Sequence, residues 1–104
     1  MELLLHYVWK HKIFPLKMLR TTTGKPVEVI DAGLPNTNAG PDFFNAKLKI
    51  DGTLWVGNVE VHTVASDWMR HGHDKDVAYD NVILHVAETV DCEVFRANGA
   101  SVPQ

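Results

Sequence analysis

Residues 41–63 read PDFFNAKLKIDGTLWVGNVEVHT and predict a β-hairpin. Phe43–Ile50 alternates apolar and polar residues, which is typical of a strand with one buried face. Asp51-Gly52 is a strong signal for a tight turn between two strands. Thr53–Thr63 is apolar on both faces, as expected of a central strand that is covered on both sides. The hairpin is therefore expected at the centre of the fold.

Acidic and imidazole side chains cluster at one end of this hairpin. Glu60 and His62 are two residues apart on the second strand, so their side chains project from the same face, about 7 Å apart along it. Asp42 enters the first strand directly after Pro41. An acidic residue on one strand with an acid and an imidazole on its neighbour indicates a divalent-metal site made of Asp42, Glu60 and His62.

The register of the hairpin decides whether these three side chains meet. With a two-residue turn, Ile50 pairs with Thr53, and Asp42 projects from the face opposite to the other two residues. With a three-residue loop and a glycine bulge, Ile50 pairs with Leu54, and Asp42 falls opposite His62. The metal hypothesis requires the bulged turn or a kink near the preceding proline, and the strand pattern does not choose between the two registers.

The remaining elements complete an α/β (α+β) fold, in which a helix precedes one mixed central sheet. The predicted helical segments are Glu2–Lys12, a turn at Leu16–Arg20, a short helix capped by Ser66 or Asp67 that runs to Arg70, and a turn at Val77–Asp80. The other predicted strands are Pro26–Ala32, Asn81–Glu88 and Cys92–Ala97, and Gly33–Pro41 is expected to be an irregular loop.

Length and charge restrict the functional classes. The 104 residues suffice for one domain, 1–104, and the abrupt tail after Asn98-Gly99 leads us to expect an N-terminal fragment of a longer chain. The net charge of −3 gives no overall positive field for nucleic acid, although a local basic patch remains open. The single Cys92 excludes an intrachain disulfide, and the first residues lack the order of a signal peptide. We expect a cytoplasmic protein without a membrane partner.

Long specific stretches resemble a bacterial family known only as domain of unknown function 2851. The chain is similar to the N-terminal part of that family in Leu5-His6-Tyr7-Val8-Trp9, Asn38-Ala39-Gly40-Pro41-Asp42-Phe43-Phe44-Asn45-Ala46, Gly57-Asn58-Val59-Glu60-Val61-His62, Ser66-Asp67-Trp68, His71-Gly72-His73 and Tyr79-Asp80-Asn81-Val82-Ile83-Leu84-His85-Val86. Members of the family are longer than this chain, and the resemblance brings no activity with it.

A second, remote resemblance is to the PD-(D/E)XK nuclease superfamily. That superfamily has a restriction-endonuclease-like core with the order helix–strand–strand–strand–helix–strand, Pro-Asp at the second strand and Glu-x-Lys on the third. Pro41-Asp42 and Glu60-Val61 occupy those places here, and His62 replaces the lysine. The resemblance implies a metal-dependent phosphodiesterase, with a central sheet and a short helix before the fourth strand.

Each candidate residue also has a purely structural interpretation. Asp42 could bind loop amides, and His62 could be a hydrogen-bond partner inside the protein. For Glu60 a functional role is the better interpretation, because burying an unpaired carboxylate in a central strand costs several kcal/mol. His71 and His73 straddle Gly72 in a polar segment; each alone is more simply a solvated side chain, but with His62 they would make a credible Zn²⁺ or Mn²⁺ set. His85, between apolar strand residues, is interpreted as a core histidine.

Three functions remain open at this stage. The leading hypothesis is a nuclease-like hydrolase in which Asp42 and Glu60 hold Mg²⁺ or Mn²⁺, His62 activates water, and His71 and His73 contact phosphate or the metal. The second is a non-catalytic binding or assembly module of the same fold. The third is a zinc site of His62, His71 and His73. Nucleic acid and the remainder of its own chain are the expected partners, and the oligomeric state is open.

Overall fold

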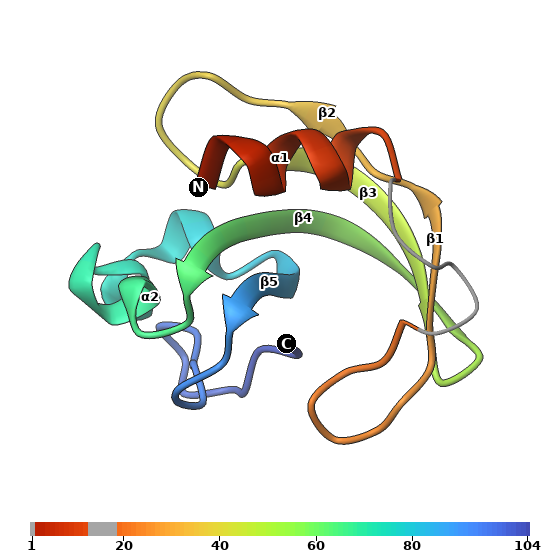
Figure 1. Cartoon of the computed structure of the whole chain (residues 1–104). Helices are drawn as coiled ribbons and strands as arrows, with labels where there is room; N and C mark the ends of the chain where they lie inside the picture. The colour runs from red at the N-terminus through yellow and green to blue at the C-terminus, as the bar shows by residue number, and fades with distance from the viewer. Residues whose placement is uncertain (1, 13–18) are drawn as a thin grey trace.

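The computed structural model describes residues 2–12 and 19–104. Along the chain its elements are α1 (Glu2–Lys10), β1 (Val27–Asp31), β2 (Leu34–Pro35), β3 (Phe43–Ile50), β4 (Thr53–Val64), α2 (Asp67–Arg70), the 3₁₀ turns η2 (His73–Lys75) and η3 (Val77–Tyr79), and β5 (Val82–Thr89). The predicted turn at Leu16–Arg20 falls largely outside the described residues. The described part of the chain is a mixed α+β fold built on a curved sheet, with α1 at its N-terminus (Figure 1).

The sheet is mixed, as the sequence predicts. Its order is β1-β3-β4-β5, and the short β2 pairs with β3 from within the segment expected to be irregular loop. β1, β3 and β4 are antiparallel neighbours, whereas β5 lies parallel to β4. Parallel neighbours need a crossover connection, which α2, η2 and η3 supply between the two strands. The crossover places helical segments at the end of β4 (Figure 1).

The hairpin has the two-residue turn, which is one of the two registers that the sequence leaves open, and not the three-residue bulged turn. Ile50 pairs with Thr53, and both turn residues have positive φ, as this turn demands. The register changes instead at a bulge inside β3, where Asn45 has φ 57° and Phe43 lies opposite Val59. A bulge places two residues against one and so reverses the alternation of side chains beyond it. Asp42 consequently lies opposite Glu60, on the same side of the hairpin, which is what a site made of these two residues requires.

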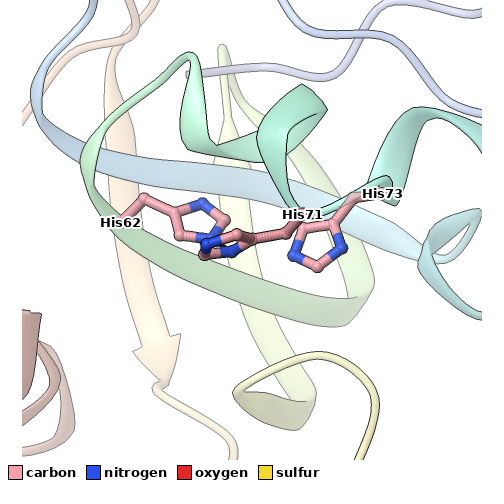
Figure 2. Close-up of side chains that lie close together, drawn as sticks. All are labelled: His62, His71 and His73. Carbon is pink, nitrogen blue, oxygen red and sulfur yellow. Dashed lines mark hydrogen bonds between the residues drawn. The ribbon is translucent and has the colours of Figure 1, made fainter.

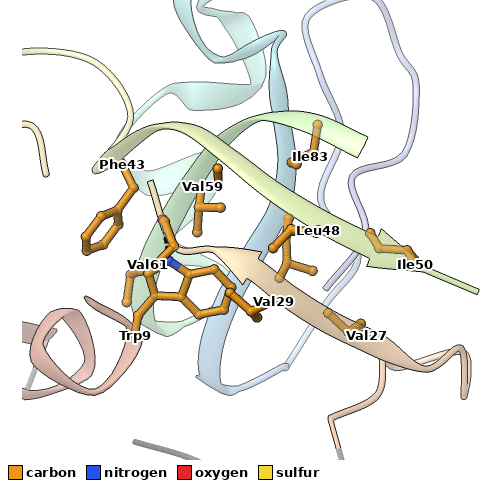
Figure 3. Packing of buried hydrophobic residues seen from close by; sticks show 12 residues of the cluster. Trp9, Val27, Val29, Phe43, Leu48, Ile50, Val59, Val61 and Ile83 are labelled. Carbon is orange, nitrogen blue, oxygen red and sulfur yellow. Dashed lines mark hydrogen bonds between the residues drawn. The ribbon is translucent and has the colours of Figure 1, made fainter. Parts of the chain in front are cut away.

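One face of the sheet packs against α1. The cluster consists of buried side chains from α1, the loop before β2 and all four long strands: Trp9, Val27, Val29, Ala32, Phe43, Ala46, Leu48, Ile50, Val59, Val61, Ile83 and Leu84. Trp9 lies across this face, and its indole Nε1 donates a 3.0 Å hydrogen bond to the carbonyl of Ala32 (Figure 3). Val59 and Val61 belong to this cluster, so Glu60 and His62 must project from the other face of β4.

The other face is covered by the crossover and the C-terminal segment. A second cluster contains Ala65, Trp68, Tyr79, Val82, Val94 and Val102. The strand predicted at Cys92–Ala97 is absent, and this segment makes one isolated bridge, Phe95 to Ser101. The carbonyl of Phe95 accepts a 2.9 Å hydrogen bond from the Trp68 indole instead of joining the sheet ladder. Within the described ranges, no helix is long and apolar enough to cross a membrane.

Candidate metal centre

Asp42 and Glu60 are interlocked at the open end of the hairpin. The backbone N–H of Asp42 donates to Glu60 Oε1 at 3.0 Å, and the N–H of Val61 donates to Asp42 Oδ2 at 2.8 Å. Glu60 is 4% exposed. Burial and, after it, the neighbouring Asp42 carboxyl raise the pKa of Glu60 well above its ordinary value. The metal-free pair therefore holds a proton, which a bound cation would replace.

The loop before β3 fixes the position of Asp42. The side-chain amide of Asn36 donates to the carbonyls of Ala39 and Pro41 at 3.0 and 2.9 Å, and its oxygen accepts from the N–H of Asn38. The N–H of Asn36 donates in turn to the carbonyl of Asp42 at 2.8 Å. A single asparagine thus folds this turn around its own side chain.

Three histidines from two segments gather at one point (Figure 2), and two of them contact Glu60. His62 comes from β4, His71 follows α2, and His73 begins η2. One ring nitrogen of each lies within 4.8 Å of the other two, and His62 Nε2 is 3.2 Å from His71 Nδ1. Glu60 Oε2 is 2.7 Å from His73 Nε2 and 3.4 Å from His62 Nε2. These separations are close to the spacing of atoms that bind one ion at about 2.1 Å, so the three histidines could hold a metal ion.

The environment keeps two of these imidazoles neutral. Burial, followed by the neighbouring histidines, lowers the pKa of His62 to about 3, and burial and His71 lower the pKa of His73 to about 4. His73 is held by a ring stack on Tyr79, with centroids 3.7 Å apart, and by the edge of Trp68. The short contacts with the protonated Glu60 are therefore not ion pairs. Neutral imidazole is the form that binds metals.

A chain of hydrogen bonds sets the tautomer of His62. The Gln104 amide is oriented by its Nε2, which donates to the carbonyl of Cys92 at 2.9 Å, so its Oε1 accepts from His85 Nδ1 at 2.8 Å. His85 Nε2 is then an acceptor, and His62 Nδ1 must donate to it across 2.7 Å. His62 Nε2 is left with its lone pair directed toward His71. Such outer partners are what orients a metal-binding histidine.

One nitrogen of the cluster lacks a hydrogen bond. His73 Nε2 is buried and, although it lies near Glu60, has no partner with hydrogen-bond geometry among the described residues. Native proteins leave few buried polar atoms unsatisfied, because each costs about 1–3 kcal/mol. A metal ion at this nitrogen would remove the deficit, so the donor set fits the ion that it suggests.

The structure therefore brings together all five residues singled out in the sequence. Asp42 and Glu60 pair with each other, while His62, His71 and His73 form the group of candidate ligands. His73 is buried rather than solvated, whereas His71 is exposed at the rim.

Sequence reasoning missed the partners of these five residues. His85 was interpreted only as a core histidine, although its place opposite Glu60 in the parallel register brings it to His62. Gln104 carries no signal in the sequence. Glu2 and His6, one helical turn apart on α1, reach Asp42 and could have been noticed from their i, i+4 spacing.

Comparison with known proteins gives one match. No curated protein and no solved structure matches the chain. The profile of a family described as protein of unknown function (DUF2851) matches residues 2–104. This match spans the α1 helix, the sheet and the histidine cluster, and confirms the resemblance to domain of unknown function 2851. The chain belongs to the DUF2851 family of proteins of unknown function.

Proposed function

We propose that the chain is a metal-dependent hydrolase that acts on phosphodiester bonds, with one Zn²⁺ or Mn²⁺ ion bound by His62, His71 and His73. The observation that supports this most is the convergence of the three imidazoles beside the Glu60 carboxyl. Imidazole suits Zn²⁺ and Mn²⁺ better than Mg²⁺, which prefers oxygen ligands. This preference favours the histidine-bound ion over the Mg²⁺ site first considered from the sequence.

Glu60 is suited to move a proton next to that ion. When bound, the ion would lower the pKa of a coordinated water and stabilise charge on the phosphoryl oxygens. A cation bound beside Glu60 would displace its proton and leave a carboxylate next to the coordinated water, where it can accept a proton. The backbone N–H of Asp42 holds the Glu60 carboxyl in place, and the backbone N–H of Val61 holds the carboxylate of Asp42. His62, held by His85, presents its Nε2 lone pair as a ligand.

The order of elements supports a nuclease-like fold. Without the short β2, the series α1, β1, β3, β4, α2 and β5 agrees with the helix–strand–strand–strand–helix–strand core of the PD-(D/E)XK superfamily. Asp42 at the start of β3 and Glu60 on β4 correspond to that superfamily's two acids. His62 stands in place of the lysine, and with its neutral ring it supplies a ligand rather than a charge.

The position of the centre favours a polymeric substrate. Cavities of 940 and 350 Å³ lie elsewhere on the described part of the molecule, and neither is lined by His62, His71 or His73. His71 lies exposed at the rim, so one side of the centre opens directly to solvent. Small substrates are normally enclosed in a pocket. A metal at an open rim suits a backbone that lies across the surface, such as that of a nucleic acid.

Metal binding and catalysis can be separated with two variants. Isothermal titration of the metal-free protein with Zn²⁺ and Mn²⁺ should show one tight site that His71→Ala weakens by more than about a hundredfold, since removing a ligand costs more than removing an outer partner. His11→Ala is the matched control, because His11 is an exposed histidine of the turn after α1 and stands outside the cluster.

Hydrolysis of bis(p-nitrophenyl) phosphate and of a labelled single-stranded oligonucleotide should require the metal. Glu60→Gln should retain the ion at the histidines and lose about a hundredfold or more in rate, which is the contribution of a general base. Unchanged binding in His71→Ala would contradict the site. Full activity in Glu60→Gln would contradict the role of the base.

A second candidate is a non-catalytic module in which the metal is structural. It is favoured by the position of His71 and His73 on the crossover, since an ion joining them to His62 would fasten that segment to β4. In this case Zn²⁺ would raise the melting temperature of the wild type and not that of His71→Ala, while no phosphodiester would be cleaved under any metal.

A further inference from the structure

A second group of metal-binding side chains lies where α1 meets the start of β3. Glu2 and His6 are one helical turn apart, and Asp42 faces them from the loop that precedes β3. His6 Nε2 is 3.3 Å from Asp42 Oδ2 and 3.9 Å from Glu2 Oε1. One ligand atom from each of the three residues lies within 4.8 Å of the other two. The spacing resembles that of ligands around one ion.

His6 supplies an independent sign of a missing ligand. Its Nε2 is buried and has no hydrogen-bond partner among the described residues, although the ring packs at 5.7 Å from Phe43. Asp42 Oδ2 already accepts from the N–H of Val61, so that oxygen is fixed in position. The buried, unsatisfied imidazole nitrogen of His6 thus lies between two carboxyl groups, and a cation would stabilise this arrangement.

We propose that Glu2, His6 and Asp42 form a second divalent-cation site, so that the chain carries a two-ion centre joined through Asp42 and Glu60. The donor set differs from that of the first site. One imidazole with two carboxylates suits a harder ion such as Mn²⁺, whereas three imidazoles suit Zn²⁺. The second site uses none of the three cluster histidines, so it stands whether or not the proposed hydrolase activity exists.

The Asp42–Glu60 pair connects the two sites. The N–H of Asp42 donates to Glu60 Oε1, and Glu60 Oε2 faces His62 and His73. The two acids therefore lie between α1 on one side and the histidine cluster on the other. A cation at Glu2, His6 and Asp42 also ties the first turn of α1 to the loop that precedes β3. The helix should then resist unfolding more in the presence of Mn²⁺.

Titration of Mn²⁺ followed by electron paramagnetic resonance tests the second site without any activity. In a His71→Ala background, which removes the first site, one Mn²⁺ should still bind per chain. Adding His6→Gln should weaken this ion at least tenfold, and adding His11→Gln should leave it unchanged. His11 is an exposed histidine just after α1 and is the matched control.

A conservative variant covers the case in which His6→Gln fails to fold. Glu2→Gln removes one carboxylate from a half-exposed position in the first turn of α1 and should also weaken Mn²⁺ at least tenfold. Far-UV circular dichroism of each metal-free variant confirms folding. The proposal is overturned if the folded Glu2→Gln variant in the His71→Ala background binds Mn²⁺ as tightly as its parent. It is also overturned if that parent binds none.

Discussion

Replacing Gln104 by leucine should weaken metal binding at a distance. The change removes the acceptor that holds the His85 Nδ1 proton, now 2.8 Å away, and the donor to the carbonyl of Cys92. His85 can then place its proton on Nε2 and donate to His62 Nδ1. In that arrangement the proton of His62 moves to Nε2, which is the nitrogen needed for the ion. The metal must displace this tautomer before it binds.

The expected magnitude follows from the two effects separately. Loss of an outer hydrogen-bond partner of a metal-binding histidine lowers metal affinity by about 10- to 100-fold, or about 1.4–2.7 kcal/mol. The buried His85 nitrogen left without an acceptor should lower the free energy of unfolding of the metal-free protein by about 1–3 kcal/mol. The backbone of His85 stays in place, because this residue lies within β5, which pairs with β4.

Calorimetric titration with Zn²⁺ measures the affinity, and ¹⁵N-detected imidazole spectra report the tautomers directly. Wild-type His62 should carry its proton on Nδ1, and Gln104→Leu should shift that population toward Nε2. An affinity change below about twofold, together with a wild-type His62 protonated on Nε2, would refute the reasoning about the hydrogen-bond chain.

Three further predictions concern the fold around the site. In Gly57→Ala, a Cβ would lie 2.5 Å from Ile83 Cγ2, so we expect a loss of about 1–3 kcal/mol of stability in urea unfolding, and an unchanged midpoint would contradict the packing. Asn36→Ala should release the turn that positions Asp42 and so weaken the binding of Mn²⁺ to Glu2, His6 and Asp42. Titration of the variant with Mn²⁺ measures this affinity. For metal-free protein in EDTA, the raised pKa of Glu60 gives stability that is full below its unfolded pKa and lost as pH rises. The free energy of unfolding of Glu60→Gln, measured in urea, should therefore rise relative to that of the wild type from pH 5 to pH 9. A difference between the two proteins that does not change with pH would contradict the raised pKa of Glu60.

The hairpin itself was predictable, whereas its register was not. Alternation along Phe43–Ile50 and the Asp51-Gly52 turn identified two paired strands correctly. The bulge in β3 depends on a contact across the hairpin, in which the N–H of Asn45 donates to the Asn58 side chain at 3.2 Å. Such a contact exists only after the strands pair, so local alternation alone could not reveal the bulge that separates the buried Phe43 from the rest of β3.

The candidate ligands were predictable one by one, but not their arrangement. The period of two on β4 correctly put Glu60 and His62 on one face. The burial of His73 depends on its stack with Tyr79, six residues later in a segment without regular periodicity. The link from His62 to His85 depends on the parallel register between β4 and β5, which the crossover sets and the sequence pattern does not.

A crystal of the protein grown with Zn²⁺ and examined at the zinc absorption edge tests the central claim most directly. We predict an anomalous difference peak about 2.1 Å from His62 Nε2, with His71 and His73 as further ligands. A fully loaded crystal with no peak there, or with zinc bound only at other residues, would contradict the metal centre.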